Sequence, residues 1–137
     1  MAGKLMLEVV TPDGSVVSDE AQIVVAPGAY GEFGVLPGHT TFLTTLKIGM
    51  LRYNDQGGNE RLVFVNGGFA EVMLNKVTVL AESADRRRDI DVERAKAALK
   101  RAQERLPEGA RREDVDFRRA QVALQRALAR VRIAETK

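Results

Sequence analysis

The sequence predicts an α+β protein in which an N-terminal antiparallel β-sandwich or barrel is followed by a C-terminal antiparallel two-helix hairpin. Short alternating runs in the first half and a helical period in the second carry this prediction. The charge also changes sign: residues 1–84 hold 5 Lys or Arg against 9 Asp or Glu, and residues 85–137 hold 16 against 10. We therefore expect a β domain over residues 1–84 and a helical domain over residues 85–137.

The first half alternates apolar and polar residues as half-buried strands do. In KLMLEVV, Leu5, Leu7 and Val9 share one face, and the turn TPDG follows with Pro12 and Gly14. The later strand-like runs are AQIVVAPG, TFLTTL, GMLRY, RLVFVNGG, FAEVML and KVTVLAE, separated by the turn signals QGGN, NGG and LNK. Many short strands at this spacing favour a sandwich or barrel. The segment GAYGEFGVLPGHTT is rich in Gly and Pro, which predicts a structured loop.

The second half has two apolar stripes with helical spacing. They are Val92, Ala95, Leu99, Ala102 and Leu106, then Phe117, Ala120, Leu124, Ala127 and Val131. Asp91 and Asp116 are each placed to cap a first turn, and Pro107 and Gly109 break the helical pattern between the stripes. Because four of these ten residues are alanines, the stripes are thin, and we expect a weakly held hairpin that leans on the β domain or on a partner.

The two helical segments repeat each other at an offset of 25 residues. DIDVERAKAALKRAQERL, from residue 89, nearly recurs as DVDFRRAQVALQRALARV, from residue 114. On a helical wheel the repeated arginines lie on one face of the hairpin: Arg94, Arg101 and Arg105, then Arg119, Arg126 and Arg130. If the helices start level across the turn, Arg94 lies level with Arg126, and Asp91 with Arg130.

Such an arginine face suits a phosphate-bearing ligand, because guanidinium groups bind phosphate oxygens and a helix start is electropositive. The competing interpretation is a solvated helix flank, which is the usual place for arginine. A third interpretation, nucleic-acid binding, rests on charge alone, since the basic half has few aromatic residues for base stacking.

No catalytic motif is present. The sequence lacks cysteine, a phosphate-binding glycine loop, a nucleophile elbow and an HExxH pair. His39 is the one histidine, and a structural, hydrogen-bonded role is the ordinary interpretation for it, as a solvated role is for Glu32. With no apolar run of membrane-spanning length, we expect a soluble intracellular protein that is not an independent enzyme.

The segments GEFGVLPGHTTFLTTLKIGMLR, VNGGFAEV and DVDFRRA, in this order, closely resemble the epsilon subunit of bacterial F-type ATP synthases from end to end. The resemblance implies a β-sandwich that binds the central gamma subunit and the c-ring, through a loop that includes Glu32 and His39. It also implies peripheral association with the cytoplasmic face of the bacterial plasma membrane, through the complex only. The hairpin, folded down, would permit ATP hydrolysis; opened along gamma toward the alpha/beta catalytic head, it would inhibit hydrolysis.

Some epsilon subunits also bind ATP on the folded hairpin, through an I/L-D-x-x-R-A motif and later arginines. By this resemblance the expected ATP-binding residues are Ile90, Asp91, Arg94, Ala95, Arg101, Arg126 and Arg130, with the upstream acidic position at Asp85. The ATP-binding relatives usually have glutamate at that upstream position, so the shorter aspartate reduces the reach of this contact. ATP is thus expected as a regulatory ligand, with any Mg²⁺ requirement open. The alternative is a stalk assembly module whose hairpin binds no nucleotide.

Overall fold

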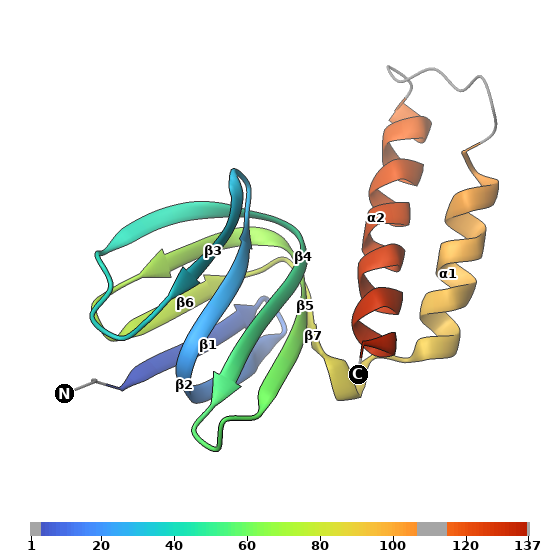
Figure 1. Cartoon of the computed structure of the whole chain (residues 1–137). Helices are drawn as coiled ribbons and strands as arrows, with labels where there is room; N and C mark the ends of the chain where they lie inside the picture. Colours follow the sequence, from blue (N-terminus) through green and yellow to red (C-terminus); the bar gives the residue numbers. More distant parts are fainter. Residues whose placement is uncertain (1–3, 107–114, 137) are drawn as a thin grey trace. The chain divides into compact units, whose positions relative to one another are not determined.

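The chain forms two compact units, shown in Figure 1, that divide between Arg87 and Arg88. The structure, a computed structural model, describes residues 4–106 and 115–136. We call the first unit the barrel and the second the hairpin. The sequence places the boundary three residues earlier, after residue 84. The difference arises because the short strand β7 (Ala84–Arg86) pairs with β5 and so extends the barrel.

Five strands close the barrel into a ring. The seven strands are β1 (Leu5–Thr11), β2 (Gly14–Gly28), β3 (Gly31–Val35), β4 (Phe42–Asp55), β5 (Glu60–Val72), β6 (Lys76–Leu80) and β7. The order β1–β6–β5–β4–β2 closes because β2 also pairs with β1, while β3 extends from β2. The pairing is antiparallel, as predicted, except between β1 and β6, which is parallel and was not predicted. This pair joins the first strand to the sixth and removes an open sheet edge.

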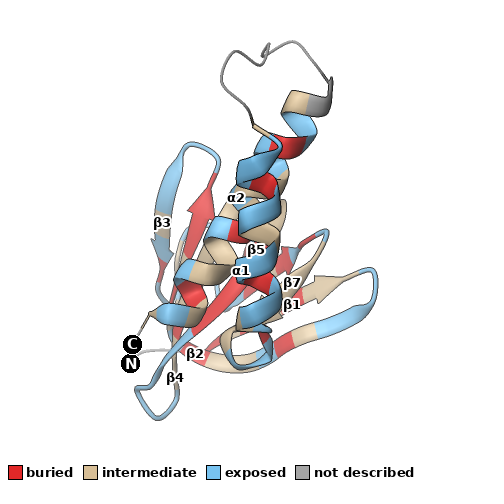
Figure 2. Cartoon of the chain, turned by 90° about the vertical axis from the view of Figure 1, so that its right-hand side faces the viewer, coloured by how far each residue is buried: buried red, intermediate tan, exposed pale blue. Residues whose placement is uncertain are grey.

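Large apolar side chains fill the barrel. Leu5, Leu7 and Val9 are fully buried, as their alternation predicts, and Leu51 and Tyr53 on β4 lie in the same core. Figure 2 shows these inward-facing strand positions in red. Fully burying one such side chain contributes about 1.5–3 kcal/mol, so the core strongly stabilises this unit.

Two glycine-rich segments differ from the prediction. GAYGEFGVLPGHTT is a loop only in part, because its Gly31–Val35 stretch is strand β3, paired with β2. NGG does not reverse the chain but lies within β5. Gly68 has a φ of 112°, and a Cβ atom there would lie 2.0 Å from the Leu80 carbonyl oxygen. The glycine therefore lets β5 pass close to β6 in a conformation that other residues avoid. RLVFVNGG and most of FAEVML thus lie in one strand, β5, and the runs TFLTTL and GMLRY, predicted separately, fall largely within the single strand β4.

The hairpin consists of α1 (Val92–Glu104) and α2 (Val115–Glu135), with a 3₁₀ turn, η1 (Arg87–Asp89), before α1. Among the helical residues whose burial the structure describes, the buried stripe positions are all alanines, and Ile133 is the one other buried residue: Ala95, Ala102, Ala120, Ala127 and Ile133. The thin stripe is thus confirmed for the described residues. The expectation that the hairpin leans on the barrel stays a prediction.

One of the two predicted caps is confirmed. Asp91 precedes α1, and its Oδ1 accepts the backbone N–H of Arg94 at 3.1 Å. Asp116 already belongs to α2, which includes Val115, so Asp116 is not the residue before that helix. The prediction assumed that the repeat starts both helices at equivalent residues. In the first copy, the turn η1 delays the start of the helix until after Asp91.

Candidate anion-binding site on the hairpin

A groove of about 170 Å³ runs between α1 and α2. Four alanines and four arginines line it: Ala98, Arg101, Ala102 and Arg105 from α1, and Ala123, Arg126, Ala127 and Arg130 from α2. Alanine has the smallest side chain that favours a helix, so the two backbones leave a hollow that longer side chains would fill. The arginine side chains provide its walls, with apolar stems and charged guanidinium heads.

The internal repeat generates this groove. Every lining residue of α1 has its counterpart in α2 at the offset of 25 residues: Ala98 with Ala123, Arg101 with Arg126, Ala102 with Ala127, and Arg105 with Arg130. Because the helices are antiparallel, equal segments in contact are related by a local two-fold axis across the groove. The repeat therefore supplies both the alanines at which the helices pack and the arginines that surround the groove with approximate two-fold symmetry.

The two helices are aligned differently from what the sequence predicts. The prediction sets Arg94 level with Arg126. Lys96 Nζ and Glu135 Oε1 form an ion pair at 3.4 Å between the helices. In an antiparallel pair this contact sets Arg126 near the level of Arg105. The prediction assumed that both helices start level at the turn, whereas α2 extends past the C-terminal end of α1 (Figure 1). The gathering of Arg101 with Arg126 and Arg130 is nevertheless observed.

The groove is strongly cationic. No carboxylate lines it, and Arg101, Arg105 and Arg126 form no ion pair within the described part of the chain. Arg101 and Arg105 are exposed, while Arg126 and Arg130 are half-buried. Like charges gathered on one surface repel each other, so an anion that bridges the helices would lower the free energy of the closed hairpin.

The I-D-x-x-R-A residues lie outside the groove lining. Ile90 and Ala95 are buried, and Asp91 caps α1 and is not level with Arg130 as predicted. Arg94 is exposed and precedes Arg101 by seven residues. Seven residues are about two turns, or about 10.5 Å, and return to nearly the same face of a helix. A ligand seated in the groove would need an extended shape to meet Arg94 as well.

Asp85 lies in a different unit from the other predicted ligand-binding residues. It sits on β7 in the barrel, where its register partner is Phe64 of β5. Its side chain is half-buried. The structure thus places Asp85 on the strand that leads out of the barrel, and the arginines beyond it in the hairpin.

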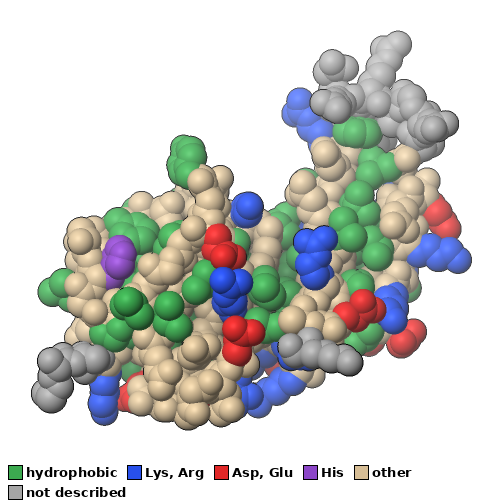
Figure 3. Space-filling view, in the orientation of Figure 1, with side chains coloured by type: hydrophobic (Ala, Val, Ile, Leu, Met, Phe, Trp, Pro, Cys, Tyr) green, Lys and Arg blue, Asp and Glu red, His purple; other side chains and the backbone are tan. Residues whose placement is uncertain are grey.

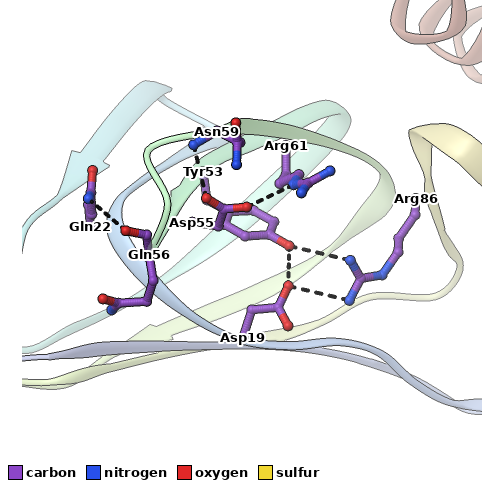
Figure 4. A network of polar contacts seen from close by, with 8 residues as sticks. All are labelled: Asp19, Gln22, Tyr53, Asp55, Gln56, Asn59, Arg61 and Arg86. Atoms are coloured by element: carbon purple, nitrogen blue, oxygen red, sulfur yellow. Dashed lines mark hydrogen bonds and ion pairs between the residues drawn. The ribbon is translucent and has the colours of Figure 1, made fainter.

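A polar network fixes β7 to the barrel, as Figure 4 shows. The Tyr53 hydroxyl donates to Asp19 Oδ2 at 2.5 Å, and Arg86 Nη2 lies 3.5 Å from the same oxygen. Arg86 Nε also donates to the Val16 carbonyl at 2.9 Å. Burial, followed by the Asp19 carboxylate, raises the pKa of Tyr53 to about 12. Sequence analysis missed this network because its members are far apart in the chain and match no motif.

Glu32 and His39 occupy two different settings in the barrel. Glu32 lies on β3, where its exposed carboxylate pairs with Arg52 Nη2 at 3.1 Å. His39 lies in the loop between β3 and β4, where its Nδ1 is 2.8 Å from the Thr40 carbonyl and its ring meets Phe42 edge-on. The structural interpretation of His39 fits these contacts.

An apolar surface adjoins the His39 loop. The Gly38 N–H donates to the Leu74 carbonyl at 2.6 Å, which ties this loop to the β5–β6 turn. Leu36 and Leu74 are 58% and 62% exposed. In Figure 3, hydrophobic side chains gather around the one histidine, drawn in purple. Exposed leucines on adjacent loops are typical of a contact surface for another protein.

Neither metal binding nor membrane spanning is indicated in residues 4–106 and 115–136. These residues contain no group of three or more His, Cys, Asp or Glu that could hold a metal ion. Neither α1 nor α2, as described, is long and apolar enough to cross a membrane.

Comparison with known proteins gives matches along the chain. Residues 4–87 match the family model of the ATP synthase delta/epsilon chain β-sandwich domain, and residues 88–135 match that of the long α-helix domain. The ATP synthase epsilon chain of Desulforapulum autotrophicum is 68% identical over 108 residues, which cover 79% of this chain and 80% of that protein. The epsilon chain of Desulfatibacillum aliphaticivorans is 63% identical over 106 residues, covering 77% and 75%.

Two solved structures share the fold. A chain of the Euglena gracilis mitochondrial ATP synthase superposes with a TM-score of 0.77 at 24% identity, covering 92% of this chain and 78% of that one. A chain from the central stalk and c-ring of the Tetrahymena thermophila mitochondrial ATP synthase gives a TM-score of 0.57 at 14% identity, covering 97% and 95%. At these identities the likeness supports the fold.

Proposed function

The chain belongs to the delta/epsilon chain family of ATP synthase, and from this premise we propose that it regulates ATP hydrolysis as the epsilon subunit of the central stalk. In this role the barrel binds the gamma subunit and the c-ring, and the hairpin acts on the alpha/beta catalytic head. The chain itself is not catalytic. It attaches to the cytoplasmic face of the bacterial plasma membrane through the complex.

We further propose that the hairpin binds ATP in its closed form. The observation that carries this proposal is the groove, in which Arg101, Arg126 and Arg130 gather from both helices. Guanidinium groups bind phosphate oxygens through paired hydrogen bonds. An extended nucleotide whose phosphates lie in the groove would run along α1 toward Arg94 and the Asp91 cap. Asp85 belongs to the barrel and lies outside the groove lining.

The regulatory mechanism is a population shift. ATP would stabilise only the closed hairpin, because opening separates the arginines of α1 from those of α2. A ligand at a hundred times its dissociation constant stabilises the state that binds it by about 2.7 kcal/mol. The thin alanine interface makes a shift of this size sufficient to move the hairpin between two states of similar free energy. When ATP is scarce, the hairpin opens and inhibits hydrolysis.

Isothermal titration of ATP into the full chain tests this proposal. We expect saturable binding that Arg126→Ala weakens strongly. Arg132→Ala is the matched control, since Arg132 is an exposed arginine of the same helix outside the groove lining. If ATP at millimolar concentration gives no heat and no protection against unfolding, the sensor proposal is wrong. The hairpin would then be an assembly element that binds no nucleotide, which is the second candidate function.

The barrel's proposed contact with the c-ring involves the His39 loop. Its support is the exposed apolar surface around Leu36 and Leu74 beside His39, with Glu32 on the neighbouring strand. The variant Leu36→Glu/Leu74→Glu should lower the recovery of this chain with the rotor after reconstitution. Gln56→Glu, in the exposed β4–β5 turn, is the control. Equal recovery of both variants would assign the rotor contact to another face.

A further inference from the structure

We propose that β7 is a releasable clasp, held by Arg86, that sets how much free chain connects the barrel to the hairpin. β7 is the last strand of the barrel, and the two units divide just after it, between Arg87 and Arg88. When β7 separates from the barrel, the connection to the hairpin therefore becomes longer. The clasp itself is a property of the barrel, and its effect on ATP hydrolysis rests on the proposed function.

Arg86 joins β7 to two further strands. The backbone of β7 pairs with β5, whereas Arg86 Nε donates to the Val16 carbonyl of β2 at 2.9 Å. Arg86 Nη1 also donates to the Tyr53 hydroxyl of β4 at 3.4 Å, and Nη2 lies 3.5 Å from Asp19 Oδ2 of β2. Figure 4 shows the guanidinium group meeting Tyr53 and Asp19 together. The planar fork of arginine permits these contacts at once, which a lysine ammonium does not reproduce.

A bulge in β2 provides part of the seat for Arg86. Val17 pairs with Val9 and Ser15 pairs with Val10, so Val16 is the extra residue between them and has no register partner on β1. A bulged residue leaves the ladder, and its carbonyl can accept from a side chain. The Val16 carbonyl accepts from Arg86 in this way. The β2 strand is thus shaped to receive the last residue of β7.

β7 can leave without opening the barrel. The ring closes through β1, β6, β5, β4 and β2, so it does not include β7. The three residues of β7 are each half-buried, and Ala84 is the small apolar residue among them that packs against the core. The release of β7 therefore exposes little apolar area.

Release also leaves neither Tyr53 nor Asp19 without a partner. The buried Tyr53 still donates its hydroxyl to Asp19 Oδ2 when Arg86 has gone. The Asp19 side chain is 38% exposed, so water can solvate its carboxylate in place of the guanidinium group. A buried polar group left unpaired would strongly oppose release. The network is arranged so that these two groups avoid that state.

The released segment is longer than β7 itself. Upstream of β7, Ala81 is buried and its N–H donates to the Val10 carbonyl at 2.9 Å, which fixes the chain at that point. Residues 82–86 would then join the connection, and five residues span at most about 18 Å when fully extended. Under the proposed function, this length would let the hairpin reach toward the catalytic head while the barrel ring stays closed.

Hydrogen exchange of the full chain tests the clasp. We expect Arg86→Ala to speed exchange in residues 82–87 by about tenfold to a hundredfold, because it removes a charged hydrogen-bonding group that holds this segment. Arg86→Lys should give a smaller increase. Arg61→Ala is the matched control, since Arg61 of β5 pairs with Asp55 at 3.0 Å in the same unit. The clasp is wrong if Arg86→Ala exchanges as Arg61→Ala does, or if exchange rises equally throughout the barrel.

A reversible disulfide between β5 and the start of the released segment tests the role in regulation. The chain has no cysteine, and the Asn66 N–H donates to the Ser83 carbonyl at 2.9 Å, in line with the β5–β7 register. Opposite residues of antiparallel strands have Cα atoms about 4.5–5.5 Å apart, which a disulfide can bridge. In ATP synthase reconstituted with Asn66→Cys/Ser83→Cys, oxidation should abolish the inhibition of hydrolysis by this chain, and reduction should restore it. Asn66→Cys alone is the control.

The results separate this inference from the proposed function. If the wild-type chain does not inhibit hydrolysis, the regulatory proposal fails, and hydrogen exchange alone decides on the clasp. If the wild-type chain inhibits and the double variant inhibits equally when oxidised and reduced, β7 stays bound during regulation and the clasp is wrong. Faster exchange in Arg86→Ala, together with inhibition that is lost on oxidation and regained on reduction, supports it.

Discussion

The barrel and the hairpin are stabilised by different kinds of contact. The barrel buries leucine, valine, alanine and tyrosine side chains within a closed ring of strands. In the part of the hairpin that the structure describes, four of the five buried helical residues are alanines, and the leucines of the stripes are only half-buried. Since apolar stabilisation scales with the area removed from water, side-chain burial stabilises the barrel more than the hairpin. The proposed function requires a bound anion or a partner to change the conformation of the hairpin, which is the less strongly packed of the two units.

The largest expected effect is in the barrel core. Leu7→Ala should destabilise the barrel by about 2–5 kcal/mol, because it removes a fully buried side chain and leaves a cavity. Urea unfolding of the full chain, followed by strand circular dichroism, measures this loss. Leu43→Ala, at a position 68% exposed on β4, should change the free energy of unfolding by less than about 0.5 kcal/mol. Similar losses for the two variants would contradict the claim that side-chain packing holds the barrel.

A smaller effect is expected at the start of the hairpin. Asp91→Ala removes the cap of α1 and should cost about 1 kcal/mol of hairpin stability, since the Arg94 N–H loses its acceptor. In a unit with so little buried area, this loss should lower the helix melting temperature measurably. Asp89→Ala, in the preceding η1 turn, is the control. Equal melting of the two variants would show that another residue starts the helix.

The polar network at β7 should contribute about as much. Tyr53→Phe removes the hydroxyl that donates to Asp19, which should cost about 0.5–1.5 kcal/mol. The contribution of Tyr53 to the free energy of unfolding should depend on pH. Because the pKa of Tyr53 is raised to about 12 from an ordinary value near 10, the folded state holds the proton more tightly than the unfolded state. The stabilisation is present below pH 10 and is lost as pH rises toward 12. Wild type should lose more stability than Tyr53→Phe over this range in urea titrations, and parallel losses would contradict the assignment.

The same contrast explains what could be predicted from the sequence. Alternation located Leu5, Leu7 and Val9 in the core, and helical spacing located Ala95 and Ala102 at the helix interface. Both patterns are local, so they can be read without knowing the fold. The pairing of β1 with β6 and the Asp19–Tyr53–Arg86 network depend on residues distant in the chain, and nothing local marks them.

The sequence predicted that arginines of both helices share one face. It did not predict how far α1 is shifted along α2. The wheel placed the arginines on one face because helical geometry fixes that face. The level of α1 against α2 depends on where each helix starts and ends, and the repeat gave no signal of the extra length of α2. As a result Arg105 lies in the groove while Arg94 does not. The 25-residue offset, applied to the alanines as well as the arginines, was the signal that could have found all eight lining residues.

The smallest expected effect is at the ion pair between the helices. Lys96 and Glu135 are about half-exposed, so Lys96→Ala should lower hairpin stability by only about 0.2–1 kcal/mol, and by less at high salt. The helix melting temperature at low and high salt, with Lys100→Ala as the unpaired control, measures the difference. Because the pair joins the two helices that carry the arginines, Lys96→Ala should also weaken ATP binding slightly. If Lys96→Ala weakens binding as much as Arg126→Ala does, the ion pair that aligns the helices is as important for the closed hairpin as the arginines of the groove.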